Sequence, residues 1–199
     1  WTRYSFDTAN AGEFFDFPEK RASLVSRGHA LHTHCDTEII PHLWEESHED
    51  MFERMRGQFA VALYDVPRHQ LTLGRDRFGI SPLYWTRQGD WLLFASEIKG
   101  LLASGMVTPQ ADLNGIDHIF TFGAMPGPTT CFAGIHLLPA GHYLQITPGQ
   151  AEPIKEHTYW EMDFPNQGDE DPGADQTKLV DEFESLLLQA VEKRLRADV

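Results

Sequence analysis

The sequence is poor in residues that several large classes of protein need. Only 16 of its 199 residues are lysine or arginine, against 30 aspartate or glutamate. The resulting formal charge of −14 argues against binding to a nucleic-acid backbone or an anionic membrane surface. Its two cysteines, Cys35 and Cys131, cannot build a disulfide framework. No apolar run approaches the length of a membrane span, and the first residues do not resemble a signal peptide. We therefore expect a soluble, cytoplasmic protein with neither a nucleic-acid nor a membrane partner.

Familiar catalytic and nucleotide-binding motifs are also missing. The sequence has no GxxxxGK[ST] phosphate loop, no GxGxxG fingerprint and no GxSxG nucleophile elbow. Cys131 could be considered as a nucleophile, but its surroundings, TTCFAGI, predict a strand that places it among core residues. We therefore expect no catalytic residue within this sequence.

The residues that are present predict a globular domain that mixes helices and strands. Hydrophobic residues make up 41% of the chain and aromatic residues 12%, which is enough to bury a core. Periodicity and turn residues predict helices over 19–28, 36–46, 48–56, 97–104 and 113–122. They predict strands over 58–66, 70–75, 83–87, 91–95, 131–137 and 142–147, the first four as an antiparallel meander. This order indicates an α+β domain whose sheet lies between helical layers.

The composition changes near the end of the chain. The stretch NQGDEDPGAD has no apolar residue other than alanine and glycine and indicates a solvated linker. After it, Phe183, Leu187, Val191 and Leu195 recur at four-residue spacing, which predicts an amphipathic helix from about Thr177. Because the sequence begins with Trp1 and ends within this helical pattern, we expect it to be a piece of a longer protein.

Two groups of residues are candidates for a binding site. Gly12 and Glu13, together with Asp36, could place two carboxylates around a small polar or cationic ligand. The alternative is a turn glycine beside exposed acids, with Asp36 capping a helix. The second group is a run rich in metal-ligand residues, and zinc binding through His32, His34 and Asp36 is a minor hypothesis. Histidines near a helix start are more often hydrogen-bonded surface residues, so we assign no metal site.

The run from Arg75 to Tyr84, RDRFGISPLY, sets two arginines around an acid beside a glycine and a proline. We interpret it as an ion-paired turn that fixes hairpin geometry, close to a site rather than part of one.

Five sequence motifs follow one another along the chain: CDTEIIPHLWEES, RMRGQFAVALYD, RDRFGISPLYW, LLFASEIKGLL and FGAMPGPTTCFAGIHLLPAGHYL. Together they resemble the glutamine-hydrolysing asparagine synthetase family, from about Gly12 to Val199. The resemblance implies a class II glutamine amidotransferase domain with the N-terminal nucleophile hydrolase fold. This fold is a four-layer α-β-β-α sandwich of mostly antiparallel sheets, and we expect an incomplete copy of it here. The first helix of an α/β synthetase domain would follow.

The family also implies a mechanism. An N-terminal cysteine, with its own α-amino group as general base, attacks the glutamine amide and forms a glutamyl thioester. Water then releases glutamate, while ammonia passes through an internal tunnel to a synthetase domain. That domain uses ATP and Mg²⁺ to activate aspartate and form asparagine. The segments with the nucleophile and with a glutamine-binding arginine have no match in this sequence, so we expect the 199 residues alone not to hydrolyse glutamine.

Matching the family's Asn-Gly-Glu and Cys-Asp-Thr-Glu segments residue by residue identifies candidate glutamine-binding residues. These are Gly12, Glu13 and Asp36, of which Asp36 would pair with the α-ammonium group. Ala11 stands where the family has an asparagine that contributes to the oxyanion hole, and Asn10 lies one position earlier. Either a local insertion brings Asn10 into that role, or the glutaminase site of this copy is weakened.

The resemblance also divides the chain. Residues 1–164 would be the amidotransferase domain without its N-terminal catalytic segment, 165–176 an acidic linker, and 177–199 the start of the synthetase domain. The final RLRADV resembles the segment before the family's pyrophosphate loop, so no ATP-site residue falls within the sequence. The implied partners are L-glutamine and the synthetase domain of the same chain, and a homodimer is left open. A catalytically inactive scaffold, and a relative with a different ammonia acceptor, are the alternatives.

Overall fold

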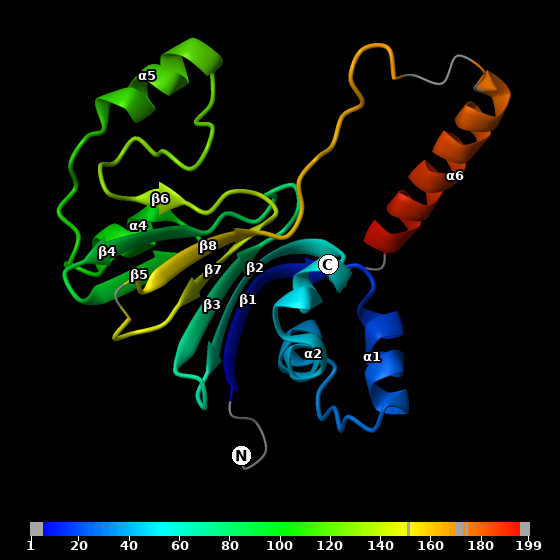
Figure 1. Cartoon of the computed structure of the whole chain (residues 1–199), viewed down its shortest axis with the longest axis horizontal. Helices are drawn as coiled ribbons and strands as arrows, with labels where there is room; N and C mark the ends of the chain where they lie inside the picture. The colour runs from blue at the N-terminus through cyan, green and yellow to red at the C-terminus, as the bar shows by residue number, and fades with distance from the viewer. Residues whose placement is uncertain (1–5, 151, 170–172, 174, 196–199) are drawn as a thin grey trace.

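A computed structural model describes residues 6–150, 152–169, 173 and 175–195, in which every strand pairing is antiparallel. Five strands form one sheet in the order β1-β2-β3-β7-β8, and three form a second sheet in the order β5-β4-β6 (Figure 1). Their bounds are β1 Phe6–Phe14, β2 Gly57–Asp65, β3 Gln70–Arg75, β4 Tyr84–Gln88, β5 Trp91–Ala95, β6 His136–Leu137, β7 His142–Ile146 and β8 Ile154–Thr158. The expected mixture of helices with antiparallel sheets is confirmed.

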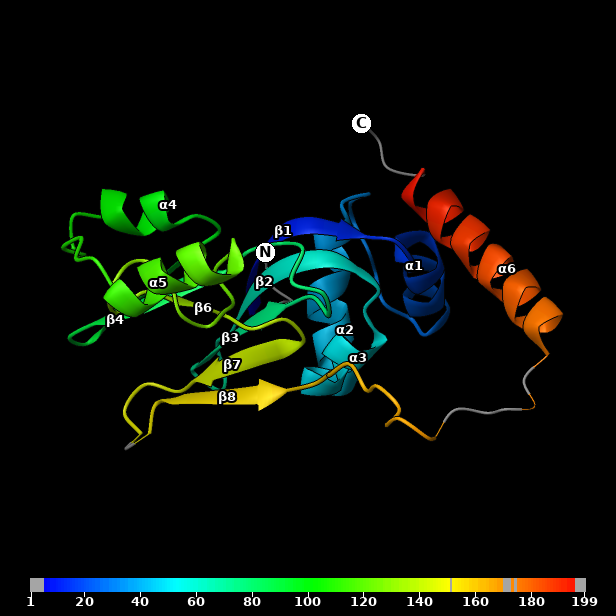
Figure 2. The same ribbon diagram turned by 90° about the horizontal axis from the view of Figure 1, so that it is seen from above.

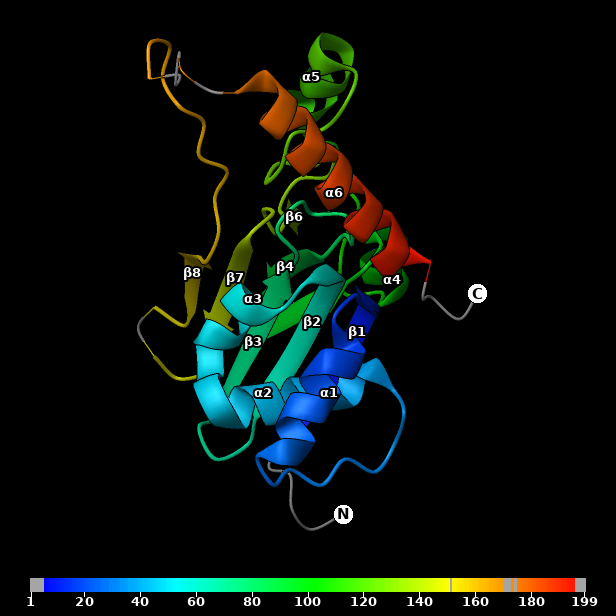
Figure 3. The same cartoon turned by 90° about the vertical axis from the view of Figure 1, so that its right-hand side faces the viewer.

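The first helices cover one face of the five-stranded sheet (Figure 3). They are α1 Phe17–Ser26, η1 Asp36–Glu38, α2 Ile39–Ser47, η2 His48–Asp50 and α3 Met51–Arg54. Trp44 and Phe52 are fully buried between these helices and the sheet. The ring of Phe52 lies over Gly74, where an added Cβ atom would come within 2.2 Å of the ring. This close approach fixes α3 against β3, because only glycine leaves room for the ring.

The strand β2 separates two cores. Its Phe59, Val61 and Leu63 point into the cluster beneath the helices, whereas Ala60 joins the cluster between the two sheets. This alternation is the expected two-residue period of a strand buried on both faces. A third cluster, around Leu101 and Ile135, packs the helix α4 (Ile98–Ala103) against the second sheet. The helix α5 (Leu113–Phe122) is capped by Asp112, whose carboxylate accepts hydrogen bonds from the amides of residues 114 and 115.

The interpretation of Arg75–Tyr84 as a hairpin turn is wrong, and so is the continuous meander. The strands on either side of this segment belong to different sheets, so the segment is a crossover. Its geometry is held by Asp76, which is 1% exposed and accepts four backbone hydrogen bonds, from the amides of Phe59, Phe78, Ile80 and Ser81. Arg75 donates to the carbonyl groups of Gly79, Ser81 and Leu138. Backbone groups, rather than an ion pair, therefore satisfy both side chains.

Two further differences concern strands. The prediction of a strand over 131–137 is wrong, because Cys131 lies in a bend and only His136–Leu137 form β6. The Thr130 hydroxyl hydrogen-bonds within this segment, to the carbonyls of Phe132 and Ile135, and folds it into a compact turn. The strands β1 and β8 were not expected, since neither has the apolar alternation that identifies a strand.

The last helix, α6 (Gln176–Arg194), starts within one residue of the expected position and lies on the opposite side of the molecule from α4 and α5 (Figure 2). Its C-terminal end reaches the segment between β1 and α1, where the guanidinium of Arg194 lies 5.2 Å from the centre of the Phe15 ring. Asp175 caps the start of α6 by accepting hydrogen bonds from the amides of Thr177 and Lys178. Part of the predicted linker, residues 170–172 and 174, and most of the final RLRADV segment, residues 196–199, lie outside the described residues. No helix in the described part of the chain is long and apolar enough to cross a membrane.

Candidate functional site

Two of the sequence-predicted binding residues, Glu13 and Asp36, line one pocket. Glu13 lies near the end of β1, and Asp36 opens η1 after a long connection. The two elements meet where the amide of Phe14 donates a 3.4 Å hydrogen bond to Oδ2 of Asp36. The pocket has a volume of about 230 Å³, and its other lining residues are Phe14, Phe15, Phe17, Pro18, His34 and Lys193. Two carboxylates beside aromatic rings can bind a small ligand that carries a positive charge.

Gly12 has a structural requirement of its own. Its φ of +132° falls in the region that favours glycine, and an added Cβ atom would lie 2.0 Å from the carbonyl oxygen of Gln58. Gly12 pairs with Phe59 on β2, so a side chain at position 12 would push the two strands apart. The glycine thus keeps β1 close to β2 immediately before Glu13. Gly12 itself does not line the pocket.

Asn10 lies two residues before Gly12 on β1 and therefore on the same face of the strand. Its Oδ1 atom is buried and has no hydrogen-bond partner within the part of the chain that the structure describes. Leaving a buried amide oxygen unpaired is unfavourable, so such an atom is a candidate for contact with a ligand or another segment. Asn10 is not among the residues that line the pocket, and the neighbouring Ala11 is exposed on the opposite face.

The expectation that Asp36 caps a helix through its side chain is wrong. Cys35 occupies the N-cap position of η1, and its side chain makes no capping hydrogen bond. Asp36 is the first residue inside the 3₁₀ turn, and its carboxylate reaches β1 instead. The side chain thereby connects the loop to the strand that carries Glu13.

Glu38 holds the loop that precedes Asp36. Its carboxylate accepts hydrogen bonds from the amides of His32 and Thr33 and from the Thr33 hydroxyl, and it lies 3.7 Å from the guanidinium of Arg21. Partial burial opposes the charged form, but these hydrogen bonds and the arginine outweigh it and lower the pKa of Glu38. The loop that delivers His34 and Asp36 to the pocket is therefore fixed at its base.

The structure does not gather His32, His34 and Asp36 into a metal-binding group. Among the residues that it describes, the one group of three with ligand atoms close together is His29, His42 and Glu45. The sequence analysis missed this group. Its only signal was the three-residue spacing of His42 and Glu45, which puts both on one face of α2.

Comparison with known sequences places this geometry in context. Residues 4–160 match the family described as "Glutamine amidotransferase domain". The chain is 32% identical over 189 residues to "Asparagine synthetase [glutamine-hydrolyzing] 3" of Bacillus subtilis, covering 94% of this chain and 30% of that protein. It is also 32% identical over 188 residues to "Amidase chry2" of Gibberella zeae, covering 94% of this chain and 27% of that protein. The chain thus spans less than a third of the length of these relatives.

Comparison with solved structures concerns the fold. A glutamine phosphoribosylpyrophosphate amidotransferase from B. subtilis superimposes with a TM-score of 0.55 at 18% identity, over 80% of this chain and 30% of that one. A structure titled as the allosteric regulatory enzyme of purine biosynthesis gives a TM-score of 0.58 at 17% identity, over 78% of this chain and 28% of that one. The arrangement of strands and helices is therefore similar to that of known amidotransferase structures.

Proposed function

Since the chain belongs to the glutamine amidotransferase domain family and is similar to glutamine-hydrolysing asparagine synthetases over 94% of its length, we propose that the pocket between β1 and η1 binds L-glutamine. The observation that carries the proposal is the convergence of Glu13 and Asp36 from separate elements on one small pocket. Two carboxylates suit the α-ammonium group of an amino acid, because a charge-assisted hydrogen bond is about twice as strong as a neutral one.

In this proposal each residue has a distinct role. Asp36 pairs with the α-ammonium group, and Glu13 supplies the second carboxylate. Gly12 lets the backbone of β1 run close to β2, which positions Glu13. Asn10 is the candidate oxyanion-hole donor, because the NH₂ group of its side chain can donate a hydrogen bond to a developing negative charge.

The reaction proposed for the whole protein is transfer of the glutamine amide nitrogen. A thiolate attacks the side-chain carbonyl carbon, the C–N bond breaks with a proton transferred to nitrogen, and ammonia leaves a thioester behind. Water then cleaves the thioester to glutamate and restores the thiol. Neither Cys35 nor Cys131 corresponds to the family's N-terminal nucleophile, so we assign that role to no residue of these 199. We further propose the complete four-layer α-β-β-α sandwich for the whole domain.

A synthetase domain is the proposed consumer of the ammonia. We place its first helix at 177–199, after the acidic linker 165–176, and the amidotransferase domain at 1–164. The helix α6 supports this proposal, because Phe183, Leu187 and Val191 are about half or more exposed along one face and would be covered by a further domain. ATP, Mg²⁺ and aspartate would bind to that domain in the cytoplasm, and no residue here is assigned to them.

A different ammonia acceptor is the second candidate. Two relatives named as amidases, chry2 of G. zeae and chyE of Penicillium rubens, are as similar to this chain as the asparagine synthetases are, at 32% and 33% identity. These values do not favour aspartate over another carboxylic acid as the acceptor.

The test is product analysis with the full-length protein that contains this chain. The protein is incubated with amide-¹⁵N-glutamine, aspartate and ATP, and the products are identified by mass spectrometry. We expect ¹⁵N-labelled asparagine. Glutamate release without labelled asparagine would indicate that the protein transfers ammonia to an acceptor other than aspartate. Absence of both products would favour an inactive scaffold and contradict the proposed function.

A further inference from the structure

The C-terminus of α1 places His29 in a defined position. Gly28, with φ of +95°, donates its amide hydrogen to the carbonyl of Val25, and the amide of His29 donates to the carbonyl of Leu24. These two bonds form a Schellman motif, in which a glycine ends the helix and fixes the residue after it. His29 is therefore held by the backbone at the start of the connection to α2.

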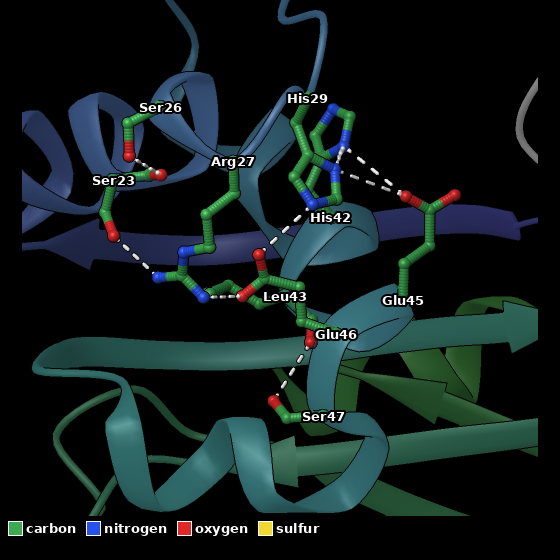
Figure 4. A network of polar contacts seen from close by, with 9 residues as sticks. All are labelled: Ser23, Ser26, Arg27, His29, His42, Leu43, Glu45, Glu46 and Ser47. Carbon is green, nitrogen blue, oxygen red and sulfur yellow. Dashed lines mark hydrogen bonds and ion pairs between the residues drawn. The ribbon is translucent and has the colours of Figure 1, made fainter.

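The side chain of His29 meets two residues of α2. Its Nδ1 atom lies 2.9 Å from Nδ1 of His42 and 3.5 Å from Oε2 of Glu45 (Figure 4). The same Glu45 oxygen lies 3.6 Å from Nδ1 of His42. His42 is 1% exposed, whereas Glu45 is 35% exposed and opens the group to solvent. This carboxylate oxygen faces both imidazole nitrogens.

These three distances match a tetrahedral metal centre. The two Nδ1 atoms and Oε2 of Glu45 form a triangle with edges of 2.9, 3.5 and 3.6 Å. A point in its plane that is equally far from all three atoms lies about 1.9 Å from each, as the circumscribed circle of these edges gives. Zinc binds imidazole nitrogen and carboxylate oxygen at about 2.0–2.2 Å. A zinc ion slightly above the plane of the triangle would thus reach all three atoms without movement of the backbone, and would leave a fourth position for water.

A second layer of contacts orients the candidate ligand His29. Its Nε2 atom lies 3.2 Å from Oε1 of Glu46, and Oε2 of Glu46 accepts a hydrogen bond from Arg27. When Nδ1 binds a metal, the neutral ring carries its proton on Nε2, where it donates to Glu46. Histidine ligands of metals commonly donate their other N–H to a carboxylate in this way, which fixes the ring.

We propose that His29, His42 and Glu45 form a Zn²⁺ site with water as the fourth ligand. None of the three lines the pocket that contains Glu13 and Asp36, so the site is distinct from the proposed glutamine site. By linking the end of α1 to α2, the metal stabilises the base of the loop that carries Asp36.

The test is zinc binding to the purified protein after removal of metal with a chelator. Zinc is titrated against a chromophoric competitor, and Co²⁺ is added separately to record the visible bands of a tetrahedral centre. We expect one Zn²⁺ per chain with a dissociation constant of about 1 μM or tighter. Glu45→Gln and His29→Gln should each weaken binding by at least ~100-fold. Glu46→Gln should weaken it by about 10–100-fold, as for other outer carboxylates.

The matched control is His32→Gln, which removes an exposed histidine of the same loop and should leave the affinity unchanged. Zinc should also raise the thermal midpoint of the parent protein but not that of Glu45→Gln. The Glu45 side chain is partly exposed, so glutamine can replace it without loss of the fold. Failure of the parent to bind stoichiometric zinc would overturn the proposal. So would equal binding by the parent and Glu45→Gln, or loss of binding in His32→Gln.

Discussion

Replacing Asp76 with asparagine should destabilise the domain severely, because this carboxylate supports the crossover between the two sheets. Each oxygen accepts two backbone amides at 3.0–3.2 Å: Oδ1 those of Phe78 and Ile80, and Oδ2 those of Phe59 and Ser81. Asparagine keeps one oxygen, so two amides would face an NH₂ group instead of an acceptor. A hydrogen bond to a charged group contributes about 1.5–3 kcal/mol, which gives a loss of about 3–6 kcal/mol.

The assay is urea denaturation followed by tryptophan fluorescence, for which the chain has five tryptophans. The matched control is Asp117→Asn, the same chemical change at an exposed position of α5, which should alter the free energy of unfolding by less than about 0.5 kcal/mol. A loss below about 1 kcal/mol for Asp76→Asn would refute the reasoning. It would mean that the crossover does not depend on these four bonds.

Two further predictions concern the elements that border the pocket. Gly12→Ala should lower the free energy of unfolding by about 3 kcal/mol or more, because the added Cβ atom meets the backbone of Gln58. The control Gly89→Ala, at a glycine with φ of +60° and open space around it, should lower it by about 1 kcal/mol. Equal losses would contradict the argument from the contact with Gln58. The lowered pKa of Glu38 means that its contribution to stability is complete above its ordinary value of 4.5 and is lost as the pH falls through the lower folded value. The parent should therefore lose more stability than Glu38→Gln between pH 6 and 3, and identical pH profiles of unfolding would contradict this.

Strong local patterns predicted most elements well. The strand β3 and the helix α5 have the bounds that their periodicity and turn residues predict. These elements were predictable because the signals that define them, alternation and capping, are short-range.

Features that depend on distant partners were not predictable. The strand β1 has little apolar character of its own and is defined by pairing with β2, more than 40 residues later in the sequence. The role of Asp76 likewise depends on amides from two separate segments, so the charges around it suggested an ion pair instead. The group of His29, His42 and Glu45 forms only when α1 and α2 pack together. The spacing of His42 and Glu45 on α2 is local, but the contact with His29 is not.

The most direct test of the central claim is the rate of glutamate release from L-glutamine by the full-length protein and its Asp36→Asn variant. The account predicts that the parent releases glutamate and that the variant raises KM at least ~10-fold with a smaller change in kcat. This split is expected because the α-ammonium group that Asp36 binds does not change during the reaction. Asp117→Asn should match the parent. A parent that releases no glutamate, or a variant with unchanged KM, would contradict the claim that this pocket binds glutamine.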